Sequence, residues 1–278
     1  MRTIAIGAFA LLATGCAHVG TFPAGAKYVA MGSSFAAGAG IGPTKPGTPE
    51  RCQRTELNYA SILAHDLSLA LDDQGCGGAT TAHLLGPWNE LPAQIDAVSP
   101  DTRLVTITVG GNDLNYIGTL FMAGCDPATG FQMGDRVIPC LPTALPSDED
   151  YAKVERQLVA VGEAVRSRAP HATLVFVQYV TLVPEQPCDA LRLTPEQARD
   201  LRGLGTRLAE ATRNAATATG AQVLDVDSLS ASHTACDAAP WSKAAPIADD
   251  PVPGAPWHPN AAGHAAIAAA LAEMLTRE

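Results

Sequence analysis

Ser34 and His258 are the residues whose types and settings could carry out nucleophilic catalysis. Ser34 lies in the motif Gly32-Ser33-Ser34-Phe35, directly after an apolar run. A serine where a strand turns into a helix exposes its hydroxyl to a substrate, and nearby backbone amides can face a developing oxyanion. His258 lies in Pro256-Trp257-His258-Pro259-Asn260, just before an Ala-rich stretch. A histidine beside such a serine can take up its proton and activate it for acyl transfer.

Two further turns carry groups that could bind the oxyanion. One is Cys76-Gly77-Gly78-Ala79-Thr80-Thr81, where glycine would let a backbone amide approach a ligand closely. The other is Gly110-Gly111-Asn112-Asp113, where the side-chain amide of Asn112 could donate a hydrogen bond. Taken singly, each motif also fits an ordinary turn or helix start, so their order along the chain carries the argument.

Strands and helices alternate along the chain and would position these motifs. The expected strands cover 27–31, 103–109, 173–177 and 222–226, with a short one before Cys76, and the expected helices cover 57–69, 148–169, 194–220 and 260–275. This alternation predicts an α/β fold with a parallel sheet covered on both faces. Segments 113–146 and 228–257 are expected to be irregular, the first pinned by a disulfide near the site and the second delivering His258.

In their order and strand context, the four motifs resemble the sequence blocks of the SGNH (GDSL-type) hydrolases. The family's blocks run GDS(L), Gly, GxND and DxxHP, and the resemblance extends from Tyr28 to the final helix. It implies a three-layer αβα sandwich with a flavodoxin-like, five-stranded parallel sheet ordered 2-1-3-4-5. In such a sheet ligands bind at the carboxyl ends of the strands beside the topological switch point, which is where the motifs fall. A single catalytic domain is expected over 27–278.

The resemblance also implies a role for each site residue. Ser34 would be the nucleophile, and His258 would be the general base and then the general acid. The backbone amides of Ser34 and Gly78 and the side chain of Asn112 would form the oxyanion hole. This mechanism needs no metal or cofactor. We expect the protein to be a serine esterase or lipase that acts on carboxylic esters of lipids or small acyl groups.

Two positions depart from the family pattern. Ser33 replaces the acid beside the nucleophile, and Ala255 replaces the acid three residues before the histidine. His258 still needs a partner for its Nδ1–H, because the wrong tautomer cannot accept the serine proton. We favour the backbone carbonyl of Ala255, which would make a Ser–His dyad. Asp249 or Asp250 folding back is the alternative.

The departures leave two other functions open. One is an O-acetyl polysaccharide deacetylase of the same fold, which an open, polar cleft would favour. The other is a catalytically silent, surface-tethered binding protein. The missing acid and Ser33 support the binding protein, whereas the joint presence of Ser34, Asn112 and His258 opposes it.

The first residues have the layout of a secretory signal peptide. A short positive start precedes an apolar run over 4–13, which is too short to span a bilayer. Ala13-Thr14-Gly15-Cys16 resembles a bacterial lipobox, so we expect a signal peptide over 1–15, lipidation at Cys16 and a tether over 16–26. The protein would be a periplasmic or cell-envelope lipoprotein, or a secreted protein if cleavage is ordinary.

The remaining six cysteines fit an oxidising compartment, where they would form three disulfides. Fifteen pairings are possible. We favour neighbours in sequence order, which gives Cys52–Cys76, Cys125–Cys140 and Cys188–Cys236. The six-cysteine pattern resembles the secreted esterase and lipase branch of the family. A zinc site is disfavoured because no CxxC spacing occurs.

Composition limits the partners. The net charge is −10 and no Lys/Arg cluster occurs, which argues against nucleic-acid binding. Hydrophobic residues make up 47% of the chain, enough for a substantial core. We expect an ester substrate as the only ligand, contact with a membrane only through the lipid anchor, and a monomer.

Overall fold

Five parallel strands form the central sheet of the computed structural model, which describes residues 22–133, 136–246 and 251–277. The strands are β1 Lys27–Gly32, β2 Ala70–Asp73, β3 Thr102–Thr108, β6 Thr173–Val177 and β7 Gln222–Leu224. Their order is β2-β1-β3-β6-β7, which is 2-1-3-4-5 counted within this sheet. The expected α/β fold and strand order are confirmed.

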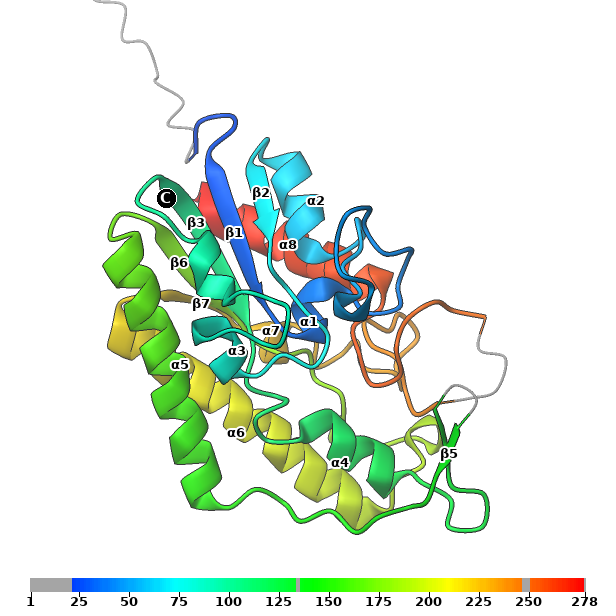
Figure 1. Cartoon of the computed structure of the whole chain (residues 1–278). Helices are drawn as coiled ribbons and strands as arrows, with labels where there is room; N and C mark the ends of the chain where they lie inside the picture. The colour runs from blue at the N-terminus through cyan, green and yellow to red at the C-terminus, as the bar shows by residue number, and fades with distance from the viewer. Residues whose placement is uncertain (1–21, 134–135, 247–250, 278) are drawn as a thin grey trace, which may run out of the picture.

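Two pairs of helices cover the sheet (Figure 1). α2 Tyr59–Asp66 contacts α8 Ala261–Thr276, and α5 Asp148–Arg168 contacts α6 Pro195–Thr219. The longest helix, α6, begins as its sequence predicts. The Thr194 side chain caps it, Pro195 is its first residue, and Gly220 ends it in the left-handed region at φ 61°.

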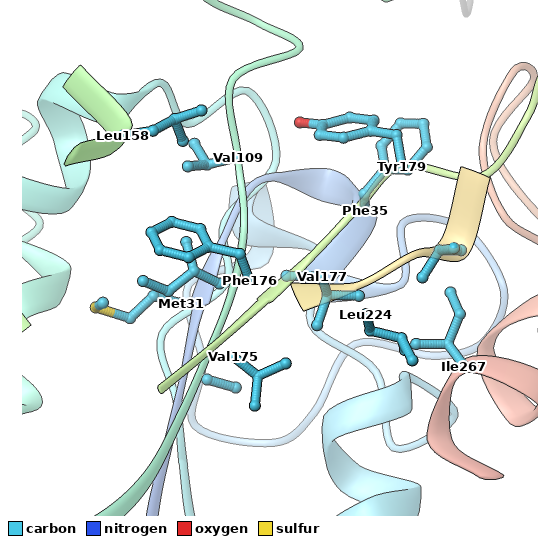
Figure 2. Close-up of a cluster of buried hydrophobic side chains, with 14 of the residues drawn as sticks. Met31, Phe35, Val109, Leu158, Val175, Phe176, Val177, Tyr179, Leu224 and Ile267 are labelled. Atoms are coloured by element: carbon cyan, nitrogen blue, oxygen red, sulfur yellow. The ribbon is translucent and has the colours of Figure 1, made fainter. Parts of the chain in front are cut away.

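The core lies between the sheet and these helices. Val175 and Phe176 of β6 are both buried although they point to opposite faces of the strand. Figure 2 shows Leu158 of α5 on one side of these strands and Ile267 of α8 on the other. A sheet packed on both faces requires strands of continuous apolar residues, as the sequence has.

The segment 113–146 is more ordered than we expected. It contains the helix α4 Tyr116–Ala123 and a hairpin of β4 Phe131–Met133 with β5 Arg136–Ile138. The sequence carries no ordinary start signal for α4, because Asn115 before it adopts the left-handed region (φ 51°) and makes no side-chain cap. α4 and β5 lie beyond the carboxyl ends of the sheet strands, the same edge as α1 Ser34–Ala37 (Figure 1).

Disulfides join the cysteines as neighbours in sequence order: Cys52–Cys76, Cys125–Cys140 and Cys188–Cys236. The second bond closes the segment that contains the β4–β5 hairpin. The predicted signal peptide over 1–15 and Cys16 lie outside the described residues. Phe22, within the predicted tether, already packs against the core.

Candidate active site

The turn that carries Ser34 is held by backbone contacts that require glycine before it. Gly32, the last residue of β1, has φ 145°, and a Cβ there would lie 2.2 Å from the carbonyl oxygen of Thr108 on β3. The side chain of Gln94 accepts a hydrogen bond from the Gly32 N–H (2.7 Å) and donates one to its carbonyl (3.0 Å). Ser33 and Phe35 are buried, whereas Ser34 between them is partly exposed. Its hydroxyl is therefore accessible on a fixed backbone.

Ser34 and His258 are 224 residues apart in the sequence but in contact in the fold. The Oγ of Ser34 lies 2.8 Å from the Nε2 of His258, a hydrogen-bond distance that permits proton transfer between them. Ser34 begins α1, and His258 ends the long loop before α8. The sequence-predicted pair is thus in contact at the carboxyl edge of the sheet.

Hydrogen bonds at His258 and at Asn260 fix the loop that carries His258. The His258 carbonyl accepts a hydrogen bond from the Lys243 N–H at 2.9 Å. Asn260 caps α8 by accepting from the Gly263 N–H (2.9 Å), and its amide donates to the Pro240 carbonyl (2.7 Å). Asn260 therefore both caps α8 and ties the loop together.

The partner of the other ring nitrogen differs from our prediction. The Nδ1 of His258 lies 2.7 Å from the carbonyl oxygen of Pro256, not of Ala255. Trp257 takes a left-handed conformation, φ 59°, and turns the chain so that the carbonyl two residues before His258 faces its ring. Ala255 instead donates its N–H to the Ala39 carbonyl at 3.1 Å. The acceptor is still a backbone carbonyl, one residue later than expected.

The alternative partners of His258, Asp249 and Asp250, lie outside the described residues. The hydrogen bond to the Pro256 carbonyl needs a proton on Nδ1, because a carbonyl oxygen only accepts. This leaves the Nε2 lone pair facing the Ser34 hydroxyl. The tautomer set by the backbone is the one that can accept the serine proton.

Burial keeps His258 neutral. The residue is 7% exposed, and burial lowers the pKa of its ring from 6.5 to about 4, although the hydrogen bond to Pro256 opposes this shift. A neutral imidazole is the form that acts as a base. His258 is therefore in its basic form across the neutral pH range.

The candidate oxyanion donors belong to the turns after β2 and β3. Gly78 has φ 82°, and neither its backbone N–H nor that of Ser34 has an acceptor among the described residues. Asn112 donates one side-chain N–H to the Ala79 carbonyl at 2.8 Å. An amide group has two such hydrogens, so one remains for a ligand.

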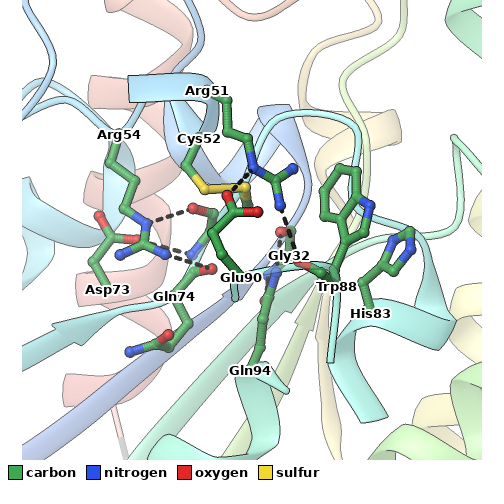
Figure 3. The surroundings of a disulfide bond; sticks show 12 residues. Gly32, Arg51, Cys52, Arg54, Asp73, Gln74, His83, Trp88, Glu90 and Gln94 are labelled. Carbon is green, nitrogen blue, oxygen red and sulfur yellow. Dashed lines mark hydrogen bonds and ion pairs between the residues drawn. A yellow bond between two sulfur atoms is a disulfide. The ribbon is translucent and has the colours of Figure 1, made fainter. Parts of the chain in front are cut away.

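Covalent and aromatic contacts hold the turn that contains Gly78. The Cys52–Cys76 disulfide joins it to the loop before α2, and the Gly77 N–H donates to the Cys52 carbonyl at 3.1 Å. Trp88 stacks on His83, with 4.1 Å between the ring centroids (Figure 3). The guanidinium of Arg51 lies over the Trp88 ring, 4.1 Å from its centroid. The turn is thus preorganised, as an oxyanion site requires.

His264 is a second buried histidine near the site. Its Nδ1 accepts a hydrogen bond from the Tyr59 N–H at 3.1 Å, which ties α8 to α2. Burial, and to a lesser extent His258, lower its pKa to about 3. It therefore stays neutral in the core.

Sequence reasoning missed two residues that support the site, Gln94 and Tyr179. Gln94 lies in a short 3-10 helix and Tyr179 follows β6. The hydroxyl of Tyr179 contacts Ser33 and Gly111. Neither residue belongs to a motif, and no spacing in the sequence distinguishes them.

The described part of the chain has neither a metal-binding cluster nor a membrane-spanning helix. Within residues 22–133, 136–246 and 251–277, no three His, Cys, Asp or Glu side chains are grouped so that they could hold a metal ion. No helix in that part of the chain is long and apolar enough to cross a bilayer.

Known proteins with similar sequences are lipases and esterases of Streptomyces. The model of the GDSL-like lipase/acylhydrolase family matches residues 30–266. "Lipase 2" of Streptomyces coelicolor is 33% identical over 259 residues, which cover 89% of this chain and 85% of the relative. An esterase of Streptomyces scabiei is 28% identical, with 85% of this chain and 80% of the relative covered.

Solved structures share the fold. The extracellular lipase of Streptomyces rimosus superposes with a TM-score of 0.69 at 25% identity, covering 89% of this chain and 98% of that one. Phospholipase A1 of Streptomyces albidoflavus NA297 superposes with a TM-score of 0.70 at 23% identity, covering 90% and 99%. The family model, the sequence relatives and the fold all indicate the same kind of enzyme as the contact between Ser34 and His258. The chain therefore belongs to the GDSL-like lipase/acylhydrolase family and is a carboxylic ester hydrolase.

Proposed function

We propose that ester hydrolysis proceeds through an acyl-enzyme on Ser34, with His258 as the general base and then the general acid. The observation that carries this proposal is the 2.8 Å contact between Ser34 Oγ and His258 Nε2, with Nδ1 bound to the Pro256 carbonyl. His258 takes the Ser34 proton as Oγ attacks the ester carbonyl carbon. It then gives this proton to the departing alcohol. In the second half, His258 activates the water that releases the acid and restores Ser34.

The oxyanion formed in each half-reaction is proposed to accept hydrogen bonds from the Ser34 and Gly78 amides and from Asn112. The two backbone amides support this role because they have no acceptor among the described residues. Asn112 supports it because the Ala79 carbonyl orients its amide group. Fixed donors of this kind do not have to reorganise when charge develops, which lowers the barrier.

The dyad costs the enzyme some stabilisation of the imidazolium. In a triad a carboxylate faces the positive ring, whereas here a neutral carbonyl does. The carbonyl still fixes the tautomer and the orientation of His258. We therefore expect His258 to have the tautomer and orientation that it would have in a triad, but without the negative charge of a carboxylate beside it.

We propose lipid or small acyl esters as substrates, selected in part by the segment 113–146. This segment begins directly after Asn112 and includes the helix α4, which lies beyond the carboxyl ends of the sheet strands, at the edge that carries Ser34 (Figure 1). The names of the relatives, lipase and esterase, agree with this class.

Export of the protein is also proposed, as a lipoprotein anchored at Cys16 or as a secreted monomer. Three disulfides support an oxidising compartment. Mass spectrometry of the mature N-terminus from an expressing bacterium distinguishes the two forms. A diacylglyceryl group on Cys16 indicates the anchor, and an unmodified N-terminus after another cleavage site contradicts it.

The test of function is hydrolysis of p-nitrophenyl esters, from acetate to palmitate, by the mature domain and its Ser34→Ala variant. We expect a maximum at one chain length and a fall of about 10³-fold or more in the variant. Activity that survives in Ser34→Ala would contradict the proposed nucleophile. If the folded protein turns over none of these esters but releases acetate from an O-acetylated polysaccharide, the deacetylase hypothesis replaces this substrate class.

A further inference from the structure

Tyr179 connects the two turns that carry the proposed nucleophile and the proposed oxyanion donor. Its hydroxyl lies 3.1 Å from Ser33 Oγ and accepts a hydrogen bond from the Gly111 N–H at 3.0 Å. Ser33 immediately precedes Ser34, and Gly111 immediately precedes Asn112. One phenol oxygen thus contacts the residue before the proposed nucleophile and the residue before the proposed oxyanion donor, in the turns that follow the paired strands β1 and β3.

The ring of Tyr179 reaches the third part of the site through Phe35. Its centroid lies 4.3 Å from that of Phe35, whose ring lies 4.8 Å from that of His258. Figure 2 shows the rings of Tyr179 and Phe35 adjacent to each other. A Cβ on Gly111 would lie 2.8 Å from Cε1 of Tyr179, so the ring fits only because residue 111 is glycine. Tyr179 therefore also supports His258, through the ring of Phe35.

The hydroxyl stays protonated at working pH. Burial raises the pKa of Tyr179 to about 12, although the hydrogen bonds to Ser33 and Gly111 oppose this shift. Because the oxygen accepts the Gly111 N–H, its own hydrogen is available to Ser33 Oγ. The pair is neutral, and it occupies the place where the family pattern has an acid.

We infer that Tyr179 is a positioning residue of this active site. Its two hydrogen bonds fix the spacing between the Ser34 turn and the Asn112 turn, and its ring supports His258 through Phe35. The inference rests on the proposed roles of Ser34, Asn112 and His258. Ser33, in place of the family's acid, is the hydrogen-bond partner that this arrangement uses.

The test removes the hydroxyl and keeps the ring. Tyr179→Phe is expected to lower kcat about 10- to 100-fold while KM changes less than about twofold, because the bonds maintain transition-state geometry and do not bind substrate. Ser33→Ala breaks one of the two bonds and is expected to have a smaller effect. The double variant is expected to match Tyr179→Phe alone, because both changes remove the same contact.

Tyr28→Phe is the matched control. Tyr28 is also a buried tyrosine, and its hydroxyl forms a hydrogen bond with Thr106 Oγ1 at 2.7 Å inside the sheet. This variant is expected to lose thermal stability but to keep kcat. If Tyr179→Phe behaves in the same way, Tyr179 is only structural and the inference is overturned.

Two further outcomes keep the test decisive. If Tyr179→Phe does not fold, Ser33→Ala carries the test, and a wild-type kcat in that variant overturns the inference. Ser34→Ala, assayed in parallel, checks the proposed function on its own. Activity remaining in Ser34→Ala contradicts the nucleophile, whereas an unaffected Tyr179→Phe contradicts only the positioning role.

Discussion

Lowering the pH to 5 is expected to leave ester hydrolysis almost intact, because His258 resists protonation. Only the neutral ring can take the Ser34 proton, so activity falls as pH drops through the pKa of His258. Burial lowers that pKa from 6.5 to about 4, and the hydrogen bond to Pro256 opposes this shift. The difference corresponds to about 3 kcal/mol against the imidazolium.

These two pKa values predict very different activities at pH 5. With a pKa of about 4, the ring is about 90% neutral at pH 5. With the unperturbed value of about 6.5, it would be about 3% neutral. The expected kcat/KM at pH 5 is therefore about nine-tenths of its value at pH 7.5.

The assay is kcat/KM for the best p-nitrophenyl ester between pH 3.5 and 8, with product read at its isosbestic wavelength. Far-UV circular dichroism at each pH separates titration of the site from unfolding. An acid limb centred near pH 6.5 in a folded protein would refute the argument that burial controls His258. A limb below about pH 5 supports it.

Further predictions concern the oxyanion hole, the disulfide and the buried histidines. Asn112→Ala is expected to lower kcat about 10²- to 10³-fold, and a loss below tenfold would remove Asn112 from the oxyanion hole. Replacing Cys52 and Cys76 by alanine is expected to destabilise the protein by about 2–4 kcal/mol and to lower kcat, because the bond anchors the Gly78 turn. Denaturant unfolding checks this, and an unchanged midpoint would contradict it. As the pH is lowered below about 6.5, the free energy of unfolding should decrease, because the unfolded chain takes up a proton at His264 that the native state does not. His264→Leu should remove up to about 1.4 kcal/mol per pH unit of that slope, and an unchanged slope would count against the buried neutral ring.

Local signals in the sequence were sufficient to predict the main elements. The continuous apolar run over 173–177 is β6 itself, and α6 begins and ends where Pro195 and Gly220 indicate. These predictions succeed because a strand buried on both faces and a capped helix each depend on neighbouring residues. The contact of Ser34 with His258 followed from motif order and from the edge at which parallel strands end.

Features that depend on a single backbone angle or a distant side chain could not be predicted. The carbonyl that orients His258 depends on the positive φ of Trp257, a conformation that bulky residues rarely adopt. The start of α4 depends on a positive φ at Asn115 in the same way. Tyr179 contacts Ser33 and Gly111, which are 146 and 68 residues away, and no local pattern encodes these contacts.

Covalent labelling of the nucleophile tests the central proposal most directly. The mature domain would be incubated with a fluorophosphonate, its residual esterase activity followed, and the labelled peptide identified by tandem mass spectrometry. The proposed dyad predicts one adduct on Ser34, activity lost in proportion to labelling, and no adduct in Ser34→Ala. An adduct on another serine, or full activity in protein labelled to completion at Ser34, would contradict it.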